Sequence, residues 1–339
     1  MTSPFDNLSI DHVRFYVEDL TAATDWLVDG YGLEIEEAGA RSAVLRRGAI
    51  RLVLRQPTAG DPGAVFLDTH GEGVADIALR VSDVSAAYGE AVGRGAESVS
   101  PPTTVDGRLS ATVMAFGDVT HTFVQPPENS REASAATGGR DIGLRGVDHV
   151  AVCLEADQLE PTVEFYKSSL GFNKIFEEYI KVGEQAMNSA VVQSQSRRVT
   201  LTLLAPDPSK APGQIDEFLK NNAGSGVQHL ALSTNDIVAA VGSIAGTGVE
   251  FLKTPASYYR MLGERLELAR HTVAELQDLS ILADQDHDGQ LYQIFASSVS
   301  PRRTFFMEVI ERLGASTFGS NNIQALYEAV EAERHRPFS

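Results

Sequence analysis

The sequence has a single cysteine, no long apolar run and no recognisable signal peptide. Cys153 is the only cysteine among 339 residues, which excludes a disulfide within the chain and favours a reducing compartment. The N-terminal sequence MTSPFDNLSI has neither the basic region nor the apolar core of a signal peptide. No apolar run reaches the roughly 20 residues that span a membrane. We therefore expect a cytoplasmic protein without a membrane partner.

Positive charge is also scarce. The chain has 28 Lys and Arg against 46 Asp and Glu, for a net charge of −18. An acidic surface repels phosphate groups, so nucleic acid and anionic lipid are excluded as expected partners. A hydrophobic fraction of 43% and a charged fraction of 22% are typical of a folded, soluble protein. The length allows two domains of ordinary size.

The chain contains two kinds of segment, and each occurs twice. Residues 10–35 (IDHVRFYVEDL…) return as residues 147–175 (VDHVAVCLEA…), and residues 73–102 match residues 226–255 without a gap. Each reads as a strand followed by a helix, and strands with alternating apolar residues follow. This pattern predicts an α+β fold of duplicated βαβββ modules that form two open barrels, and the interior of such a barrel is a natural small-molecule site.

The domain boundaries follow from composition. Residues 127–145 are rich in Ser, Ala and Gly and have no periodicity, so they are predicted to be a linker. This gives an N-terminal domain at 8–126 and a C-terminal domain at 146–339. The latter ends in a helix at about 322–334, whose apolar face should pack at the mouth of the second barrel.

The two halves differ at chemically important positions. The C-terminal half has His149, His229 and Glu308, which are almost evenly spaced. The N-terminal half keeps His12 at the first position but has Asp76 at the second. We expect no counterpart of the segment FFMEVIER there, because the chain runs from HTFVQ into the linker.

Two imidazoles and one carboxylate on the strands of one barrel can form a facial triad for non-haem Fe(II). The same groups could hold catalytic zinc, and the spacing does not distinguish the metals. A structural alternative is that both histidines are hydrogen-bonded core residues and that Glu308 pairs with Arg302 or Arg303. The retained His12 favours this alternative, because a histidine survives there without the rest of the set.

The C-terminal half contains, in this order, the motifs GVDHVAV, GVQHLAL, YYRMLGERL, ILADQDHDGQLYQIF and FFMEVIERLG. In content and order they resemble the 4-hydroxyphenylpyruvate dioxygenase family of the vicinal-oxygen-chelate (glyoxalase-like) superfamily. The resemblance implies that His149, His229 and Glu308 bind Fe(II), that the substrates are 4-hydroxyphenylpyruvate and O2, and that the final helix is a gate. It implies an N-terminal domain without catalytic residues, and a homodimer.

Two reactions share this scaffold in the family. Both begin with oxidative decarboxylation of the keto acid, after which either the ring is oxidised to homogentisate or the benzylic carbon is hydroxylated to 4-hydroxymandelate. Thr202 and Leu204 replace a proline and an asparagine of the dioxygenases, Ile323 and Tyr327 each replace a phenylalanine, and Asn188 replaces an arginine. These departures resemble the hydroxymandelate synthases, which are associated with antibiotic biosynthesis.

Further substrate contacts are implied by the same resemblance. Ser189, Gln214 and Gln293 match motifs that face the substrate, and Phe318 is expected to stack on its ring. Our hypothesis is therefore an iron-dependent dioxygenase that makes 4-hydroxymandelate. The alternatives are the dioxygenase that makes homogentisate, a metal-free protein that sequesters a ligand, and a zinc lyase or isomerase.

Overall fold

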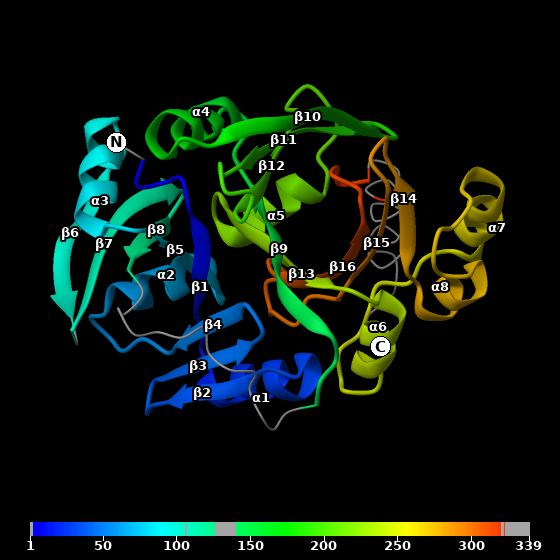
Figure 1. The fold of residues 1–339 in the computed structure, drawn as a ribbon, viewed down its shortest axis with the longest axis horizontal. Helices are drawn as coiled ribbons and strands as arrows, with labels where there is room; N and C mark the ends of the chain where they lie inside the picture. Colours follow the sequence, from blue (N-terminus) through cyan, green and yellow to red (C-terminus); the bar gives the residue numbers. More distant parts are fainter. Residues whose placement is uncertain (1–2, 106, 126–139, 320–321, 323–339) are drawn as a thin grey trace.

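The computed structural model describes residues 3–105, 107–125, 140–319 and 322. It contains two eight-stranded mixed sheets, one in each half of the chain (Figure 1). Among the described residues, no helix is long and apolar enough to cross a membrane. The predicted α+β fold of duplicated βαβββ modules in two open barrels is confirmed.

The first sheet is built from two modules separated by helix α2. The elements are β1 (Ser9–Tyr16), α1 (Leu20–Tyr31), β2 (Glu34–Ala38), β3 (Ser42–Arg47), β4 (Ile50–Arg55), α2 (Pro62–His70), β5 (Gly73–Arg80), α3 (Val84–Gly93), β6 (Ser98–Val105), β7 (Arg108–Phe116) and β8 (Val119–Val124). The strand order is β2-β3-β4-β1-β5-β8-β7-β6, so the first strands of the two modules pair at the centre. They run antiparallel, and each is parallel to the last strand of its own module.

The second sheet repeats this order as β10-β11-β12-β9-β13-β16-β15-β14. Its elements are β9 (Leu144–Cys153), α4 (Leu159–Leu170), β10 (Asn173–Val182), β11 (Gln185–Gln193), β12 (Thr200–Pro206), α5 (Gln214–Asn222), β13 (Gly226–Thr234), α6 (Ile237–Ile244), α7 (Ala256–Arg265), α8 (Val273–Leu279), β14 (Leu282–Gln285), β15 (Gln290–Phe295) and β16 (Phe306–Leu313). Helices α7 and α8 are an insertion that the repeat alone does not predict. Strand β9 includes the last two residues of the predicted linker, Leu144 and Arg145.

The repeat extends to the residues that cap the helices. Asp83 accepts a hydrogen bond from the amide of Ala86 at the start of α3, and Asp236 accepts one from Ala239 at the start of α6. Such side-chain caps satisfy amides that have no partner within the helix. The gap-free match between these segments therefore preserves the local signal that starts each helix.

The two halves pack directly against each other, and most of the described core residues form one large cluster that spans both. The ring of Phe15 meets the ring of Phe305 edge-on at 5.0 Å. Nε2 of the buried His121 lies 2.8 Å from the hydroxyl of Tyr166 in α4. The N-terminal half thus packs against helix α4 and against the segment just before β16. In Figure 1 the N-terminal half lies on the left and the second sheet lies on the right.

Candidate metal centre

Three adjacent strands position the triad. Strands β9, β13 and β16 are neighbours, and Ala231 of β13 is paired with His149 on one side and with Glu308 on the other. Paired residues project from the same face of a sheet, and so do residues two apart along a strand. His229 therefore shares this face with the other two. Because Ala231 is small and buried, it leaves room for the larger side chains to converge.

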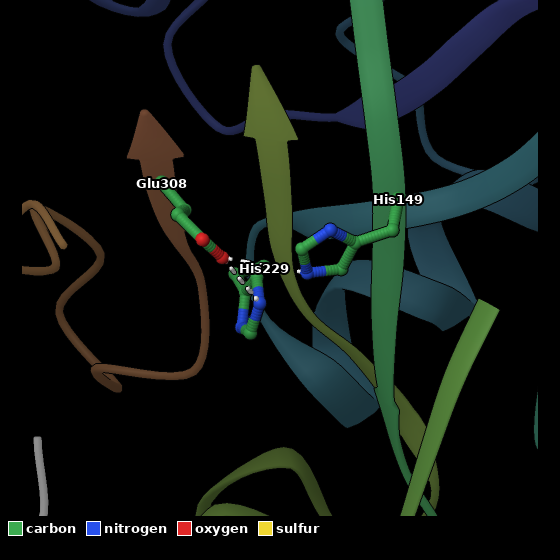
Figure 2. Close-up of side chains that lie close together, drawn as sticks. All are labelled: His149, His229 and Glu308. Atoms are coloured by element: carbon green, nitrogen blue, oxygen red, sulfur yellow. Dashed lines mark ion pairs between the residues drawn. The ribbon is translucent and has the colours of Figure 1, made fainter. Parts of the chain in front are cut away.

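The three side chains meet at one point inside the second barrel (Figure 2). Oε2 of Glu308 lies 3.4 Å from Nε2 of His149 and 3.1 Å from Nε2 of His229. All three side chains are buried. Two ligands at right angles, each about 2.1 Å from an ion, are about 3 Å apart. The observed separations therefore fit a metal bound at adjacent coordination positions.

One oxygen of the carboxylate is left over. Oε1 of Glu308 is buried and has no hydrogen-bond partner, although an unpaired oxygen of a buried carboxylate is costly. A cation at this point would compensate the cost. Two imidazole nitrogens and one carboxylate are also the donor set of the facial triad, which leaves coordination positions open for substrate and oxygen.

The pKa shifts within the triad indicate that a positive charge is stabilised next to Glu308. Burial alone would lower the pKa of His149, but the carboxylates of Glu308 and Asp148 outweigh it and raise that pKa to about 9. Burial lowers the pKa of His229, and Glu308 only partly offsets this effect. Burial would raise the pKa of Glu308, yet the two histidines hold it below its ordinary value. Without metal, a proton on His149 thus compensates the buried carboxylate.

The outer nitrogens of the histidines are held by their sequence neighbours. Nδ1 of His149 lies 2.9 Å from Oδ1 of Asp148, and Nδ1 of His229 lies 3.3 Å from Oε1 of Gln228. If Nδ1 carries the hydrogen and donates it to these oxygens, each Nε2 keeps its lone pair for a metal. We did not predict Asp148 and Gln228 from the sequence, although the dipeptide Asp-His recurs as Asp11-His12 and could have indicated the first.

The structural alternative for Glu308 is not supported in the case of Arg302. The guanidinium of Arg302 donates hydrogen bonds to the backbone oxygens of Asp68 and Thr69, at the end of helix α2. Arg302 therefore joins the two halves of the molecule. The described partners of Glu308 are the two histidines.

A second acidic cluster is satisfied without a metal. Asp236, His271 and Glu311 also lie close enough together to be considered as ligands. However, the carboxylate of Glu311 accepts hydrogen bonds from the amide of Ile237 and from Arg270, and it lies 2.9 Å from His271. A cation is already present in the form of the guanidinium. This cluster therefore ties β16 to the start of α6.

Three of the predicted substrate residues share the face of the triad. Thr202 pairs with Ala151, two residues from His149. Gln293 pairs with Ile310, two residues from Glu308. The third is Ser189, which pairs with Leu204, opposite Cys153 on β9. All three are buried. The pairing thus places them in the same barrel interior as the triad.

The remaining predicted contacts lie around this interior. Gln214 begins helix α5, which packs on a small apolar cluster that includes Cys153 and Leu204. The ring of Phe318 meets the ring of His149 edge-on at 4.9 Å. Ile323 and Tyr327, with the predicted gate helix at 322–334, lie outside the described residues apart from position 322.

One of the pocket departures was placed wrongly. Asn188 is exposed and pairs with Tyr179 and Ala205, on the face of β11 opposite to Ser189. Alternate residues of a strand project to opposite faces, so Asn188 points away from the barrel interior. It carries no information about the substrate.

The expectation that FFMEVIER has no N-terminal counterpart is also wrong. Strand β8 occupies in the first sheet the place that β16 occupies in the second. Asp76 pairs with Thr120, which puts Thr122 at the position equivalent to Glu308. The hydroxyls of both threonines donate to Oδ1 of Asp76 at 2.7 Å. The segment HTFVQ was expected to be a strand, but it was not recognised as the counterpart because it has Thr122 in place of the carboxylate.

Comparison with known proteins agrees with this fold. Residues 146–294 and residues 11–113 each match a family model described as the Glyoxalase/Bleomycin resistance protein/Dioxygenase superfamily. The 4-hydroxyphenylpyruvate dioxygenase of Dictyostelium discoideum is 32% identical, over 96% of this chain and 97% of the relative. The enzyme of the same name from Danio rerio is 31% identical, over 96% and 91%. The chain belongs to the 4-hydroxyphenylpyruvate dioxygenase family.

A solved structure extends the similarity. A mutant of 4-hydroxymandelate synthase from Streptomyces coelicolor is 39% identical, with a TM-score of 0.85 over 97% of this chain and 99% of that one. The resemblance found in the sequence is thus confirmed at the level of the whole fold.

Proposed function

We propose that the chain is an Fe(II)-dependent enzyme that converts 4-hydroxyphenylpyruvate and O2 into 4-hydroxymandelate and CO2. The observation that carries the metal assignment is the convergence of His149, His229 and Glu308, with one carboxylate oxygen unpaired. These three residues would hold the iron. Bound Fe(II) would supply the chelation of the keto acid and the activation of oxygen.

Other residues of the chain would orient the substrate. The hydroxyl of Thr202 and the amide nitrogen of Gln214 are buried and have no hydrogen-bond partner. Such groups are expected to find a partner in a ligand, because leaving them unpaired is unfavourable. The phenol and the carboxylate of the keto acid offer suitable oxygens. Phe318, packed against His149, would shield the reacting atoms from water.

The choice of the benzylic product depends on the pocket wall. Thr202 and Leu204 lie on the barrel interior, and each replaces the residue that the dioxygenases have there. Leu204 cannot hydrogen-bond, so an anchor of the substrate ring is lost, while Thr202 adds a hydroxyl. We infer that the ring sits differently and that the side-chain carbon is presented for oxidation. The similarity to a 4-hydroxymandelate synthase supports this choice.

The second candidate is the dioxygenase that makes homogentisate, which the names of the curated relatives favour. Incubation of the purified protein with Fe(II), O2 and 4-hydroxyphenylpyruvate distinguishes the two. The products have the same elemental composition, so they must be separated by chromatography against standards. We expect 4-hydroxymandelate as the main product, and homogentisate as the main product contradicts the proposal.

The metal itself is tested separately. Protein isolated without oxygen should contain iron and should lose activity when a chelator removes it. Zinc at one ion per chain would indicate a lyase or isomerase instead, and failure to bind any divalent metal would indicate a protein that only sequesters its ligand. The homodimer and the cytoplasmic location stay predictions, and light scattering would test the first.

A further inference from the structure

Arg312 stands four residues after Glu308 on β16 and reaches the first metal ligand indirectly. Its Nε lies 2.9 Å from Oδ2 of Asp148, and its Nη2 lies 2.9 Å from Oδ1. Two parallel hydrogen bonds of this kind fix a carboxylate in orientation as well as in position. Oδ1 of the same carboxylate lies 2.9 Å from Nδ1 of His149. The guanidinium of Arg312 thus fixes the carboxylate of Asp148, which in turn fixes the ring of His149.

Arg312 also holds the segment that follows β16. Its Nη1 donates to the backbone oxygens of Ala315 at 3.3 Å and of Thr317 at 2.7 Å. Its guanidinium carbon lies 4.9 Å from the centre of the Phe318 ring, and this ring packs on His149. Arg312 therefore restrains His149 in two ways, through the carboxylate of Asp148 on one side and through the packed ring of Phe318 on the other.

The N-terminal half shows what such a clamp does without a metal site. Nδ1 of His12 lies 2.9 Å from Asp11, and Arg80 of β5 donates two hydrogen bonds to Oδ2 of Asp11 at 3.2 and 2.8 Å. In the gap-free match of the two halves, Arg80 corresponds to Ser233, so the two arginines come from different strands. The Asp–His–Arg unit can therefore be purely structural, and the experiment must separate that role from a role in metal binding.

We propose that Arg312 is a positioning residue of the metal centre, which acts through Asp148 to hold His149 with Nε2 directed at the metal. The inference rests on the proposed function, because it requires that the triad binds a divalent ion. It adds a residue that touches neither metal nor substrate but sets the geometry of both the first ligand and Phe318.

The test is the dissociation constant for Co(II) or Fe(II), measured without oxygen by competition with a chromophoric chelator. The variants are Arg312→Ala, Asp148→Asn and the double variant. Loss of a group that orients a metal-bound histidine costs about 10- to 100-fold in affinity, so each single variant should bind metal at least about 10-fold more weakly. The double variant should bind no more weakly than the weaker single one, because the two residues act as a unit.

Two matched controls are available in the same chain. Arg80→Ala removes two hydrogen bonds to Asp11 beside His12 in the N-terminal half and leaves Arg51 next to that carboxylate. Asp286→Asn loosens the segment at Ser316 and Thr317 from the other side without touching Asp148. Arg80→Ala should change the metal dissociation constant by less than about twofold, because Arg80 shares no described partner with Arg312. Asp286→Asn disturbs only the segment that carries Phe318, so its loss of metal affinity should be clearly smaller than that of Arg312→Ala.

Three outcomes overturn the inference. They are unchanged metal binding in Arg312→Ala, additive losses in the double variant, and a loss in Asp286→Asn as large as that in Arg312→Ala. If Arg312→Ala does not fold, Arg312→Lys replaces it, since lysine keeps the charge but cannot form the paired hydrogen bonds. A wild-type protein that binds no divalent metal contradicts the proposed function itself, which is a different result from tight binding that Arg312 does not affect.

Discussion

Thr122 and Glu308 occupy equivalent positions in the two sheets, one on β8 and the other on β16. A hydroxyl thus stands in the first barrel where the carboxylate of the triad stands in the second. Asp76 replaces His229 in the same comparison, and Nη1 of Arg14 lies 3.9 Å from its Oδ2. In the first barrel the positive charge near this position is therefore the guanidinium of Arg14, whereas in the second barrel a metal would supply it.

This relationship predicts the effect of removing Arg14. Asp76 is only 1% exposed, so Arg14→Ala removes the guanidinium that lies beside its buried carboxylate. We expect the free energy of unfolding to fall by about 1–3 kcal/mol, as measured by urea denaturation. Adding Asp76→Asn to this variant should recover part of the loss, because the stranded charge is gone. A double variant less stable than Arg14→Ala would contradict this account.

A metal at the triad should stabilise the fold. A ligand that binds only the native state adds about 2.7 kcal/mol at 100 times its dissociation constant, so Fe(II) or Co(II) should raise the melting temperature of the wild type. Glu308→Gln should abolish this metal-dependent rise. Glu311→Gln on the same strand is the matched control. It removes the hydrogen-bonded carboxylate of the other cluster, so it should lower the melting temperature but keep the metal-dependent rise.

The sequence was sufficient for the repeat and the fold, because duplication and periodicity are visible in the order of the residues. The convergence of His149, His229 and Glu308 was expected from the resemblance to a known family, since their spacing alone left a structural alternative open. The sequence was insufficient to show that Thr122 is equivalent to Glu308, because the two strands carry different residues at this position. The same holds for Arg312, which meets Asp148 only through the pairing of distant strands. Asn188 shows the opposite error, since this substitution was assigned to the pocket although the side chain points outward.

Thr202 offers a test of substrate contact that is independent of the product. Its hydroxyl is buried and unpaired in the free protein, so Thr202→Val should not lower the free energy of unfolding. If the hydroxyl binds the substrate, the variant loses a hydrogen bond of about 0.5–1.5 kcal/mol, and KM for 4-hydroxyphenylpyruvate should rise by about two- to tenfold. Equal KM in both proteins would exclude this contact, and Thr200→Val at the start of the same strand is the control.

The carboxylate of Asp286 should make the stability of the fold depend on pH, because it binds the segment that follows β16. Burial alone would raise its pKa, but hydrogen bonds outweigh it and hold the pKa well below the ordinary range. The groups that donate them are the amide and hydroxyl of Thr317 and the amides of Asp288 and Ser316.

Because the folded-state pKa is depressed, this stabilisation is complete above the unfolded pKa of about 3.9 and is lost as the pH falls through the folded value. The difference in unfolding free energy between wild type and Asp286→Asn should therefore be largest at neutral pH and shrink below about pH 4. Urea denaturation at pH 7, 5, 4 and 3 measures it. A difference that grows in acid would show that the carboxylate is not stabilised by these donors.

Ile323 provides the sharpest test of product choice, although it lies outside the described residues and the prediction rests on the sequence alone. The resemblance to the dioxygenases implies that phenylalanine stands there in those enzymes, so we expect Ile323→Phe to restore an aromatic wall. We expect the ratio of homogentisate to 4-hydroxymandelate to rise, because the wall should bring the substrate ring closer to the oxidant. Chromatography of both products at matched substrate consumption measures the ratio, and Ile323→Leu, which keeps the volume, is the control. An unchanged ratio with intact metal binding would separate the two proposals: the metal centre would stand, and the choice of carbon would have to be set by Thr202, Leu204 or other residues of the barrel interior.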